Sequence, residues 1–154
     1  MFDAPRELVW KAWTDPERLV QWWGPKGFTL TSARLDLRPG GVFHYSMQPP
    51  QGAKIWATFV YREVDAPERL AWVVSFSDEQ GGMRRNPWIA TWPLEVLSMM
   101  TLFPVEEKTA LMMSSVPINA SEEECKAFEA GRNGMQGGFK GTFDQLDAYL
   151  AKGK

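Results

Sequence analysis

Few side chains in this sequence could do acid–base chemistry, and His44 and Glu63 are the candidates. His44 is the single histidine, and it lies in a run of alternating apolar and polar residues from 42 to 47. In a strand of this kind the aromatic residues share one face and His44 takes the other, so an inward aromatic face turns His44 toward solvent. A general base needs a positioned partner and a substrate within hydrogen-bond reach. His44, or a buried carboxylate such as Glu63, therefore supports only an alternative, enzymatic hypothesis.

Nucleophilic and metal chemistry have less support. Cys125 is the single cysteine and falls in the first turn of a predicted helix, a position that can make a thiol reactive. The run of glutamates at 122–124 opposes that effect, which favours an inert thiol. One His and one Cys are too few for a structural zinc site. The sequence also lacks a nucleophile elbow, an HExxH helix, a Walker loop and a dinucleotide fingerprint, so no cofactor or metal site is predicted.

Aromatic residues are the strongest chemical signal. The 154 residues include eight Trp, nine Phe and three Tyr, more than a small domain needs to close a core. An apolar, aromatic lining with a few polar groups is typical of a small-molecule pocket. The alternative is that the same residues fill a solid core, because protein interiors are close-packed. The predicted ligand-binding residues are Trp22, Trp23, Phe43, Tyr45, Met47, Trp56, Trp72, Phe76, Trp88, Met113, Met135, Phe139 and Phe143.

Composition excludes several classes of partner. We expect a single domain spanning residues 1–154, since this length is typical of one domain. The 17 Lys and Arg against 19 Asp and Glu are spread along the chain, which argues against nucleic acid or an anionic membrane as a partner. The sequence contains no run of 18 apolar residues, so it does not predict membrane insertion. A lone cysteine favours a reducing, cytoplasmic compartment.

The elements that would position these side chains follow from periodicity. Two short helices are predicted within residues 3–24, the second introduced by Asp15 before Pro16 and closed by Gly24. A period of two then predicts neighbouring antiparallel strands joined by short turns. These six strands are 28–37, 42–47, 55–64, 70–76, 92–103 and 110–118.

One connection between strands is long. Residues 77–91 contain Arg84 and Arg85 beside Trp88. Loops of this type close over ligands in many binding sites. We predict a gate at the mouth of the cavity; the alternative is a passive, solvated link.

The last segment predicts a long amphipathic helix. Ser121 and Glu124 form a capping box, and apolar residues from Phe128 to Leu150 recur on one face. The glycines at 134, 137 and 141 lie opposite that face. They suggest close approach of another element, a homodimer contact or a bend in the helix; the alternative is a helix that merely tolerates its glycines.

Several stretches, in this order and spacing, resemble a known family. They are FDAPRELVWKAWTDPERLVQWW at 2–23, GP at 24–25, DLRPGG at 36–41, VYREVDAPERLAW at 60–72 and GTFDQLDAYL at 141–150. Across essentially the whole chain, the sequence resembles bacterial proteins similar to the activator of the heat-shock-protein-90 ATPase. That family belongs to the START-related, polyketide-cyclase-like superfamily (SRPBCC), which shares the fold of the birch pollen allergen.

The resemblance implies an α+β helix-grip fold, in which a curved antiparallel sheet of six to seven strands wraps the long C-terminal helix and two short helices close one end. The family usually has a strand before FDAP, whereas this sequence begins with Met1 and Phe2; either the chain starts late or that strand is absent. An absent strand would leave one sheet edge unpaired.

Three functions remain open. The leading hypothesis is a non-catalytic protein that binds an apolar or aromatic small molecule, such as a lipid-, steroid- or polyketide-like compound, between sheet and helix. The second is a cyclase- or hydrolase-type enzyme, and the third is a chaperone-interaction module. The third has the least support, because the chain lacks the separate chaperone-binding domain of the full eukaryotic activator.

Overall fold

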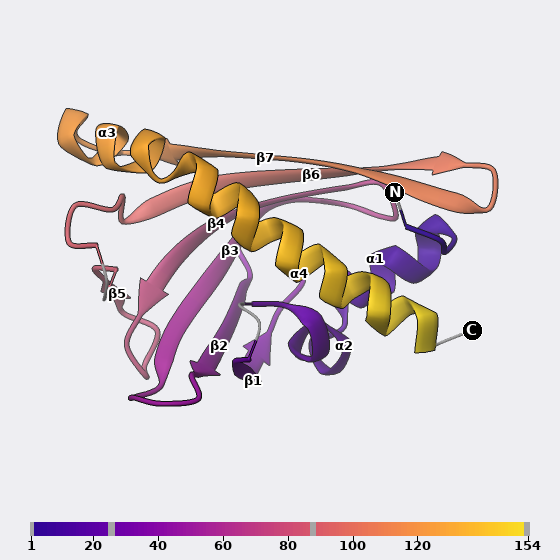
Figure 1. The fold of residues 1–154 in the computed structure, drawn as a ribbon, viewed down its shortest axis with the longest axis horizontal. Helices are drawn as coiled ribbons and strands as arrows, with labels where there is room; N and C mark the ends of the chain where they lie inside the picture. Colours follow the sequence, from indigo (N-terminus) through magenta and orange to yellow (C-terminus); the bar gives the residue numbers. More distant parts are fainter. Residues whose placement is uncertain (1, 25–26, 87–88, 153–154) are drawn as a thin grey trace.

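A curled antiparallel sheet wraps one side of a long C-terminal helix (Figure 1). The computed structural model describes residues 2–24, 27–86 and 89–152; within these, the side-chain surroundings of residues 32, 33, 133, 135 and 138 lie outside the description. The helices are α1 (Arg6–Thr14), α2 (Pro16–Trp22), α3 (Glu122–Ala130) and α4 (Arg132–Lys152). The strands are β1 (Thr29–Leu35), β2 (Val42–Gln48), β3 (Ile55–Asp65), β4 (Arg69–Ser77), β5 (Met83–Arg84), β6 (Glu95–Val105) and β7 (Lys108–Ile118).

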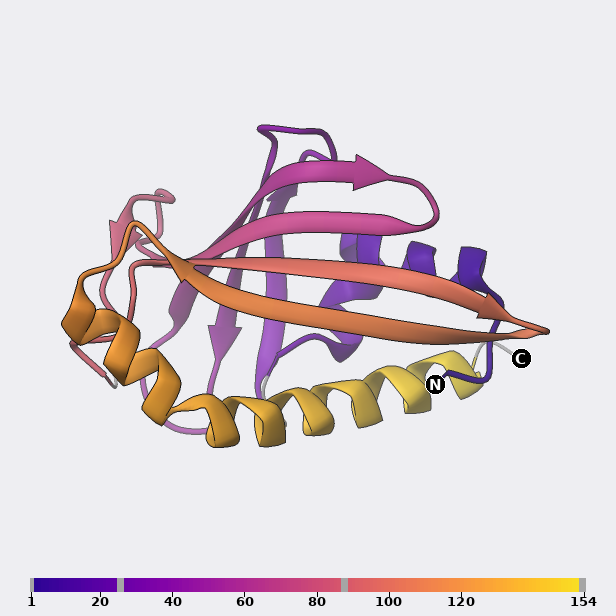
Figure 2. The same cartoon turned by 90° about the horizontal axis from the view of Figure 1, so that it is seen from above.

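The strands pair in the order β1-β2-β3-β4-β6-β7, and β5 pairs with the end of β4. The helix-grip prediction is confirmed, and the six predicted strands are all present. Strand ends differ from the predicted bounds by at most three residues, the largest difference being that β6 begins at Glu95 rather than at residue 92. The long connection also contains β5. Figure 2 shows β6 and β7 as a long hairpin that runs beside α4.

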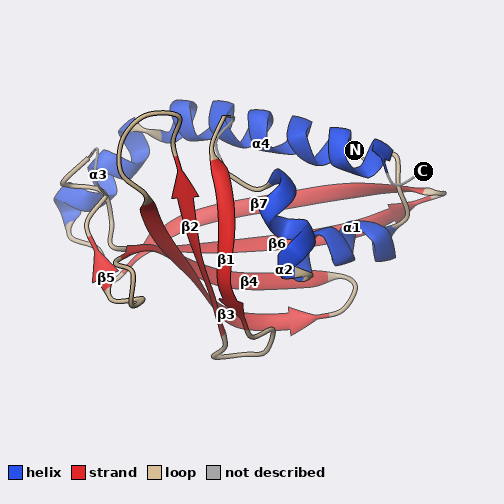
Figure 3. Cartoon of the chain, turned by 90° about the horizontal axis from the view of Figure 1, so that it is seen from below, coloured by secondary structure: helices blue, strands red, loops and turns tan. Residues whose placement is uncertain are grey.

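The second N-terminal helix, α2, begins as its capping residues predict. The Asp15 side chain accepts a hydrogen bond from the Glu17 backbone N–H at 3.0 Å, and Pro16 takes the first helical position. The Trp22 indole N–H donates to the Ala12 carbonyl oxygen at 2.9 Å and so ties α2 to α1. Figure 3 shows both helices at the end of the molecule toward which α4 runs.

The predicted C-terminal helix is divided in two. The Ser121–Glu124 capping box is present at the start of α3, and α4 continues as the long helix after Gly131. A Cβ added at Gly131 would lie 3.0 Å from the Trp92 ring, which also packs on Phe128 at 5.2 Å between centroids. A side chain at position 131 would therefore crowd Trp92 where the two helices join.

Polar side chains fix α4 against the end of α2. The Gln145 amide donates to the carbonyl oxygens of Trp22 and Gly24 at 3.1 and 2.9 Å. Thr142 also donates to Gly24, at 3.2 Å. These contacts hold the C-terminal half of α4 beside the N-terminal helices, as Figure 1 shows.

The glycine face of α4 is open. A Cβ added at Gly134, Gly137 or Gly141 would meet no atom within 4 Å. No described element of the chain approaches the helix there, and self-association through this face stays a prediction.

The outer edge of the sheet is partly occupied. Phe2 forms an isolated antiparallel bridge with Thr109 at the start of β7, through backbone hydrogen bonds of 2.7 and 3.0 Å. The Thr109 hydroxyl also donates to the Ala4 carbonyl oxygen at 2.7 Å. Within the described residues, no strand pairs with the rest of this edge of β7.

Candidate functional site

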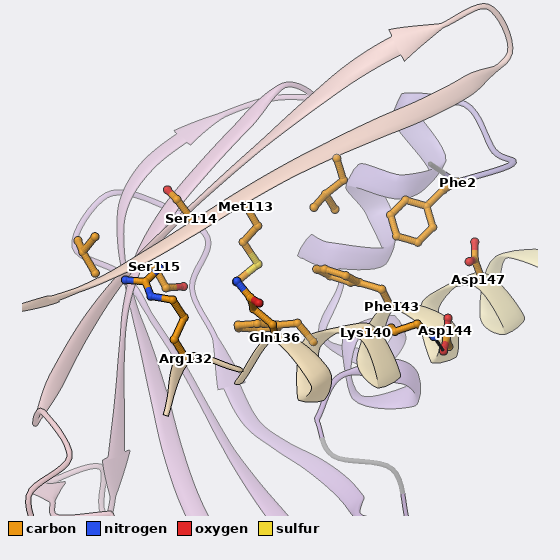
Figure 4. A pocket seen from close by; sticks show the side chains of 13 residues that line it. Phe2, Met113, Ser114, Ser115, Arg132, Gln136, Lys140, Phe143, Asp144 and Asp147 are labelled. Atoms are coloured by element: carbon orange, nitrogen blue, oxygen red, sulfur yellow. Dashed lines mark hydrogen bonds and ion pairs between the residues drawn. The ribbon is translucent and has the colours of Figure 1, made fainter. Parts of the chain in front are cut away.

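A cavity of about 680 Å³ lies between the edge strand β7 and α4 (Figure 4). Its size falls in the range of small-molecule pockets. Its lining residues come from three places, the N-terminal bridge, the middle of β7 and one side of α4: Phe2, Leu111, Met113, Ser114, Ser115, Val116, Arg132, Gln136, Phe139, Lys140, Phe143, Asp144 and Asp147.

The strand register decides which side chains form its apolar wall. Leu111 and Met113 pair with Leu102 and Met100, which are fully buried on the inner face, so all four point toward α4. Phe139 and Phe143 lie one turn apart on α4, and Figure 4 shows Phe143 reaching across the space toward β7. The wall is thus aromatic on the helix and aliphatic or thioether on the strand.

Charged and polar groups of α4 surround that wall. Figure 4 shows Arg132 and Gln136 extending from the helix toward β7. Arg132 binds Glu129 through two hydrogen bonds, of 3.1 and 2.8 Å, and this contact lowers the pKa of Glu129. Lys140 lies 3.5 Å from Asp144. Charges of both signs therefore stand at the rim and are exposed to solvent, while the interior is apolar.

A second cavity, of about 420 Å³, lies between α2 and β1 and has no aromatic lining. The first cavity is the stronger candidate, because it lies between sheet and helix and is lined by aromatic and methionine side chains.

The predicted site residues divide between this cavity and the core. Met113, Phe139 and Phe143 line the cavity together. Seven others lie on the inner side of the sheet or at α2 without lining it, and most of them are fully buried. These are Trp22, Trp23, Phe43, Tyr45, Met47, Trp72 and Phe76.

Contacts between aromatic rings explain why these seven residues do not enclose a cavity of their own. The Phe59 ring stacks on Trp72 at 5.3 Å and meets Trp23 edge-on at the same distance, and Trp13 lies 5.6 Å from Trp72. Such pairs are favourable packing geometries. In the middle of the sheet, the alternative of a solid core describes the structure better than an aromatic-lined cavity.

Trp56 lies on the opposite side of the sheet. Its strand neighbour Thr58 pairs with His44, so Trp56 and His44 share the outer face, with ring centroids 4.9 Å apart. Successive side chains of β3 alternate between the two faces of the sheet, and Ala57 and Phe59 occupy the inner face, so Trp56 must lie on the outer one. The expectation that Trp56 faces a cavity between sheet and helix is wrong.

The solvent-facing position expected for His44 is also wrong. The ring is 5% exposed, and Nε2 lies 3.2 Å from the Asp78 carbonyl oxygen, to which it can only donate. Trp56 and the turn after β4 cover it. Glu63 lies beyond a bulge in β3 and forms a half-exposed ion pair with Arg69 at 3.5 Å. Neither side chain lines the cavity, so neither is positioned to act on a ligand there.

Two predicted residues cannot be placed. Trp88 lies outside the described residues, and so does the side chain of Met135.

Cys125 is exposed and unbonded. Among the residues that the structure places, no cluster of three metal-ligating side chains occurs.

The long connection is tied to α3. Arg85 forms an ion pair with Glu124, and Arg84 forms one with Asp78 at 3.7 Å. The Asp78 backbone N–H donates to the Gly82 carbonyl oxygen, and the Gly82 backbone N–H donates to the Asp78 carboxylate. The second bond lowers the pKa of the Asp78 carboxyl. None of the described residues of 77–91 lines the cavity, so the structure gives this segment no place at its mouth.

Sequence reasoning missed the polar side of the cavity. Arg132, Gln136 and Lys140 recur every four residues along α4, beside the apolar positions Phe139 and Phe143. This spacing was visible in the sequence as a polar stripe bordering the apolar one. It also missed three buried polar atoms without a hydrogen-bond partner on the aromatic side chains of Trp13, Tyr61 and Trp72.

Comparisons with known proteins agree with this architecture. The crystal structure of protein Ms6760 from Mycobacterium smegmatis superposes with a TM-score of 0.78 at 24% identity, covering 99% of this chain and 88% of that one. A solution structure of a protein from Arthrobacter aurescens superposes with a TM-score of 0.80 at 28% identity, covering 98% of this chain and 82% of that one. Protein NE0264 from Nitrosomonas europaea superposes with a TM-score of 0.75 at 27% identity, covering 99% of this chain and 91% of that one. No curated protein matches the sequence.

No helix in the described part of the chain is long and apolar enough to cross a membrane. The family model for "Activator of Hsp90 ATPase homolog 1-like protein" matches residues 3–151, nearly the whole chain. Together with the curled sheet that wraps α4, this match shows that the chain belongs to the family of Activator of Hsp90 ATPase homolog 1-like proteins.

Proposed function

We propose that the protein binds an apolar or aromatic small molecule, of lipid-, steroid- or polyketide-like character, in the cavity between β7 and α4. The observation that carries the proposal is the apolar wall of Leu111, Met113, Phe139 and Phe143, which encloses a volume suited to a small ligand. Methionine adds adaptability, because its unbranched side chain can follow ligands of different shape.

The chemistry of the lining favours binding over catalysis. The candidate bases His44 and Glu63 lie outside the cavity, and the charged groups at its rim are exposed. A ligand would bury its apolar body against Phe139 and Phe143 while a polar end stayed near the rim.

Adjacent methionines on β7 provide a matched test. Met113 faces the cavity, whereas Met112 points to the other side of the sheet and is 65% exposed. Glutamate at position 113 would place a charge against the ligand, which is costly in apolar surroundings. Glutamate at position 112 makes the same chemical change in solvent.

Binding of the neutral fluorescent probe N-phenyl-1-naphthylamine would be titrated in the wild type, Met113→Glu and Met112→Glu. We expect Met113→Glu to weaken binding by at least about tenfold, with Met112→Glu close to wild type. Thermal unfolding confirms that both variants fold. Absence of binding to the wild type, or equal losses in both variants, would contradict the proposal.

A further inference from the structure

Three buried aromatic side chains carry polar atoms without a hydrogen-bond partner among the described residues: Trp13 Nε1, Trp72 Nε1 and Tyr61 Oη. Each of these side chains is at most 1% exposed. Buried polar atoms almost always have a partner, and an exception calls for a physical explanation. An indole N–H can only donate, so what these indoles lack is an acceptor.

The three side chains are neighbours. Tyr61 and Trp72 are direct cross-strand partners on β3 and β4, on the inner face of the sheet. Directly opposed side chains in an antiparallel pair lie in contact. Trp13 of α1 packs on Trp72 with ring centroids 5.6 Å apart. The structure thus gathers three unpaired hydrogen-bond donors in one region of the interior.

Other interior tryptophans do not share this state. Trp22 donates to the Ala12 carbonyl oxygen at 2.9 Å, and Trp23 donates to the Tyr45 hydroxyl at 3.3 Å. The fold can therefore supply acceptors to buried indoles elsewhere. Among the described aromatic side chains, the buried polar atoms without a partner belong to the group that packs around Trp72; the Arg6 guanidinium Nε is a further buried donor without one.

Phe143 links the cavity to one member of this group, Trp13. Phe143 lines the cavity, and its ring lies 6.4 Å from that of Trp13 between centroids. It is half-buried, and Figure 4 shows it extending from α4 into the region between the helix and β7. Rotation of the Phe143 side chain would extend the cavity toward Trp13, the member of the group that it contacts, without moving the backbone.

The donors define what such an extension would accept. All three are neutral, and burial raises the pKa of Tyr61, so its hydroxyl stays protonated at neutral pH. A carboxylate would bring a charge that neutral donors do not balance, whereas a carbonyl oxygen supplies acceptor sites alone. The fitting chemical class is a ketone, ester or quinone oxygen at the end of an apolar body.

We infer that Trp13, Tyr61 and Trp72 form the inner end of the ligand site and donate hydrogen bonds to a carbonyl oxygen of the ligand, which reaches them when Phe143 turns aside. This inference rests on the proposed binding function and names its ligand class. It requires that a carbonyl ligand bind more tightly than a hydrocarbon of the same shape.

Two ligands of nearly equal shape test it: 2-acetylnaphthalene, which has a carbonyl oxygen, and 2-isopropenylnaphthalene, which has a methylene in its place. Dissociation constants come from calorimetry and from quenching of tryptophan fluorescence. We expect the ketone to bind the wild type about tenfold more tightly, the contribution of one or two buried hydrogen bonds. In ¹⁵N-labelled protein, the indole N–H signals of Trp13 and Trp72 should shift with the ketone and not with the hydrocarbon.

Variants assign the effect to the donors. Tyr61→Phe and Trp72→Phe should each lower the ratio of ketone affinity to hydrocarbon affinity several-fold, because each removes one of the proposed donors. The control is Tyr45→Phe, which removes a buried hydroxyl that already has a partner in Trp23 and should keep the preference. If one donor variant fails to fold, the other still tests the assignment.

The outcomes separate this inference from the proposed function. If neither ligand binds, the proposed function fails. If both bind with equal affinity, ligands occupy the cavity but the donors do not engage the carbonyl, and the inference is wrong. A ketone preference that survives in Tyr61→Phe and Trp72→Phe also overturns it, because the carbonyl would then be bound elsewhere.

Discussion

Replacing Tyr61 by Phe should stabilise the ligand-free protein, although it removes a buried polar group. The Tyr61 hydroxyl is buried and has no hydrogen-bond partner among the described residues, a state that costs roughly 1–3 kcal/mol. Phe keeps the ring and removes that cost, and the small space left by the oxygen offsets part of the gain. We expect the free energy of unfolding at pH 7 to rise by about 1 kcal/mol, which raises Tm by about 2–4 °C in a chain of this length.

Tyr45 is the matched comparison. It is equally buried, but its hydroxyl accepts a hydrogen bond from the Trp23 indole at 3.3 Å. Tyr45→Phe leaves that indole without its acceptor, so the free energy of unfolding should fall by about 1 kcal/mol. Two substitutions of the same chemical type should therefore have opposite signs.

The dependence of the free energy of unfolding on pH above 10 provides a second measurement. Burial raises the pKa of Tyr61 above its ordinary value of 10.0, and burial raises that of Tyr45 to about 12. Between pH 10 and these higher values the unfolded chain loses protons that the folded chain keeps, so wild-type stability is complete below pH 10 and declines as pH rises above it. The decline should be shallower in Tyr61→Phe, because one of the two groups is gone.

Urea unfolding at pH 7 and at several values from 9.5 to 11 measures both effects. A loss of more than about 1 kcal/mol at pH 7 in Tyr61→Phe, with an unchanged dependence on urea, would refute the reasoning. It would mean that the hydroxyl has a partner such as a buried water, and the group around Trp72 would no longer lack an acceptor.

Three further perturbations test other parts of the fold. Trp22→Phe removes a buried indole that donates to a backbone carbonyl of α1, and should lower the free energy of unfolding by about 2 kcal/mol or more in urea titrations. Gly41→Ala places a Cβ 2.0 Å from a backbone oxygen of its own turn, and should cost about 3 kcal/mol by thermal unfolding; a Tm near wild type would contradict this contact. The pKa of Glu124 lies below its ordinary 4.5, first because the Ser121 backbone N–H binds it and then because Arg85 does, so its stabilising effect is present above pH 4.5 and is lost as pH falls below that value. Arg85→Ala should make acid unfolding between pH 5 and 3 less steep, and an unchanged profile would show that the ion pair does not contribute.

Local signals in the sequence predicted most of the elements. Alternation in residues 42–47 identified the inner face of β2, and Asp15 with Pro16 located the start of α2. The Ser121–Glu124 capping box located the start of α3. In each case the residues that carry the signal also make the hydrogen bonds or the packing, so the signal and its physical cause lie within a few positions of each other.

Features that depend on distant residues could not be predicted in this way. The junction between α3 and α4 at Gly131 packs against Trp92, which lies before β6. The burial of His44 depends on the turn at Asp78, which folds over the outer face. Periodicity assigns a residue to a face, but it does not show what covers that face.

The position of the cavity shows the same limit. Phe43 and Met113 both face inward, yet only Met113 borders open space. Phe43 belongs to the middle of the sheet, where aromatic side chains fill the interior, whereas Met113 lies on an edge strand. Which inner residues line a cavity therefore depends on strand order, and strand order is set by the whole chain.

The bridge between Phe2 and Thr109 has a practical consequence for anyone who purifies this protein with an affinity tag. Because the bridge is antiparallel, a peptide joined ahead of Phe2 would be directed along the free edge of β7, toward Leu111 and Met113. Those residues line the cavity, and an added strand could pair with that edge. Affinities measured with an N-terminal tag and after its removal should therefore be compared before either is taken as a property of the protein itself.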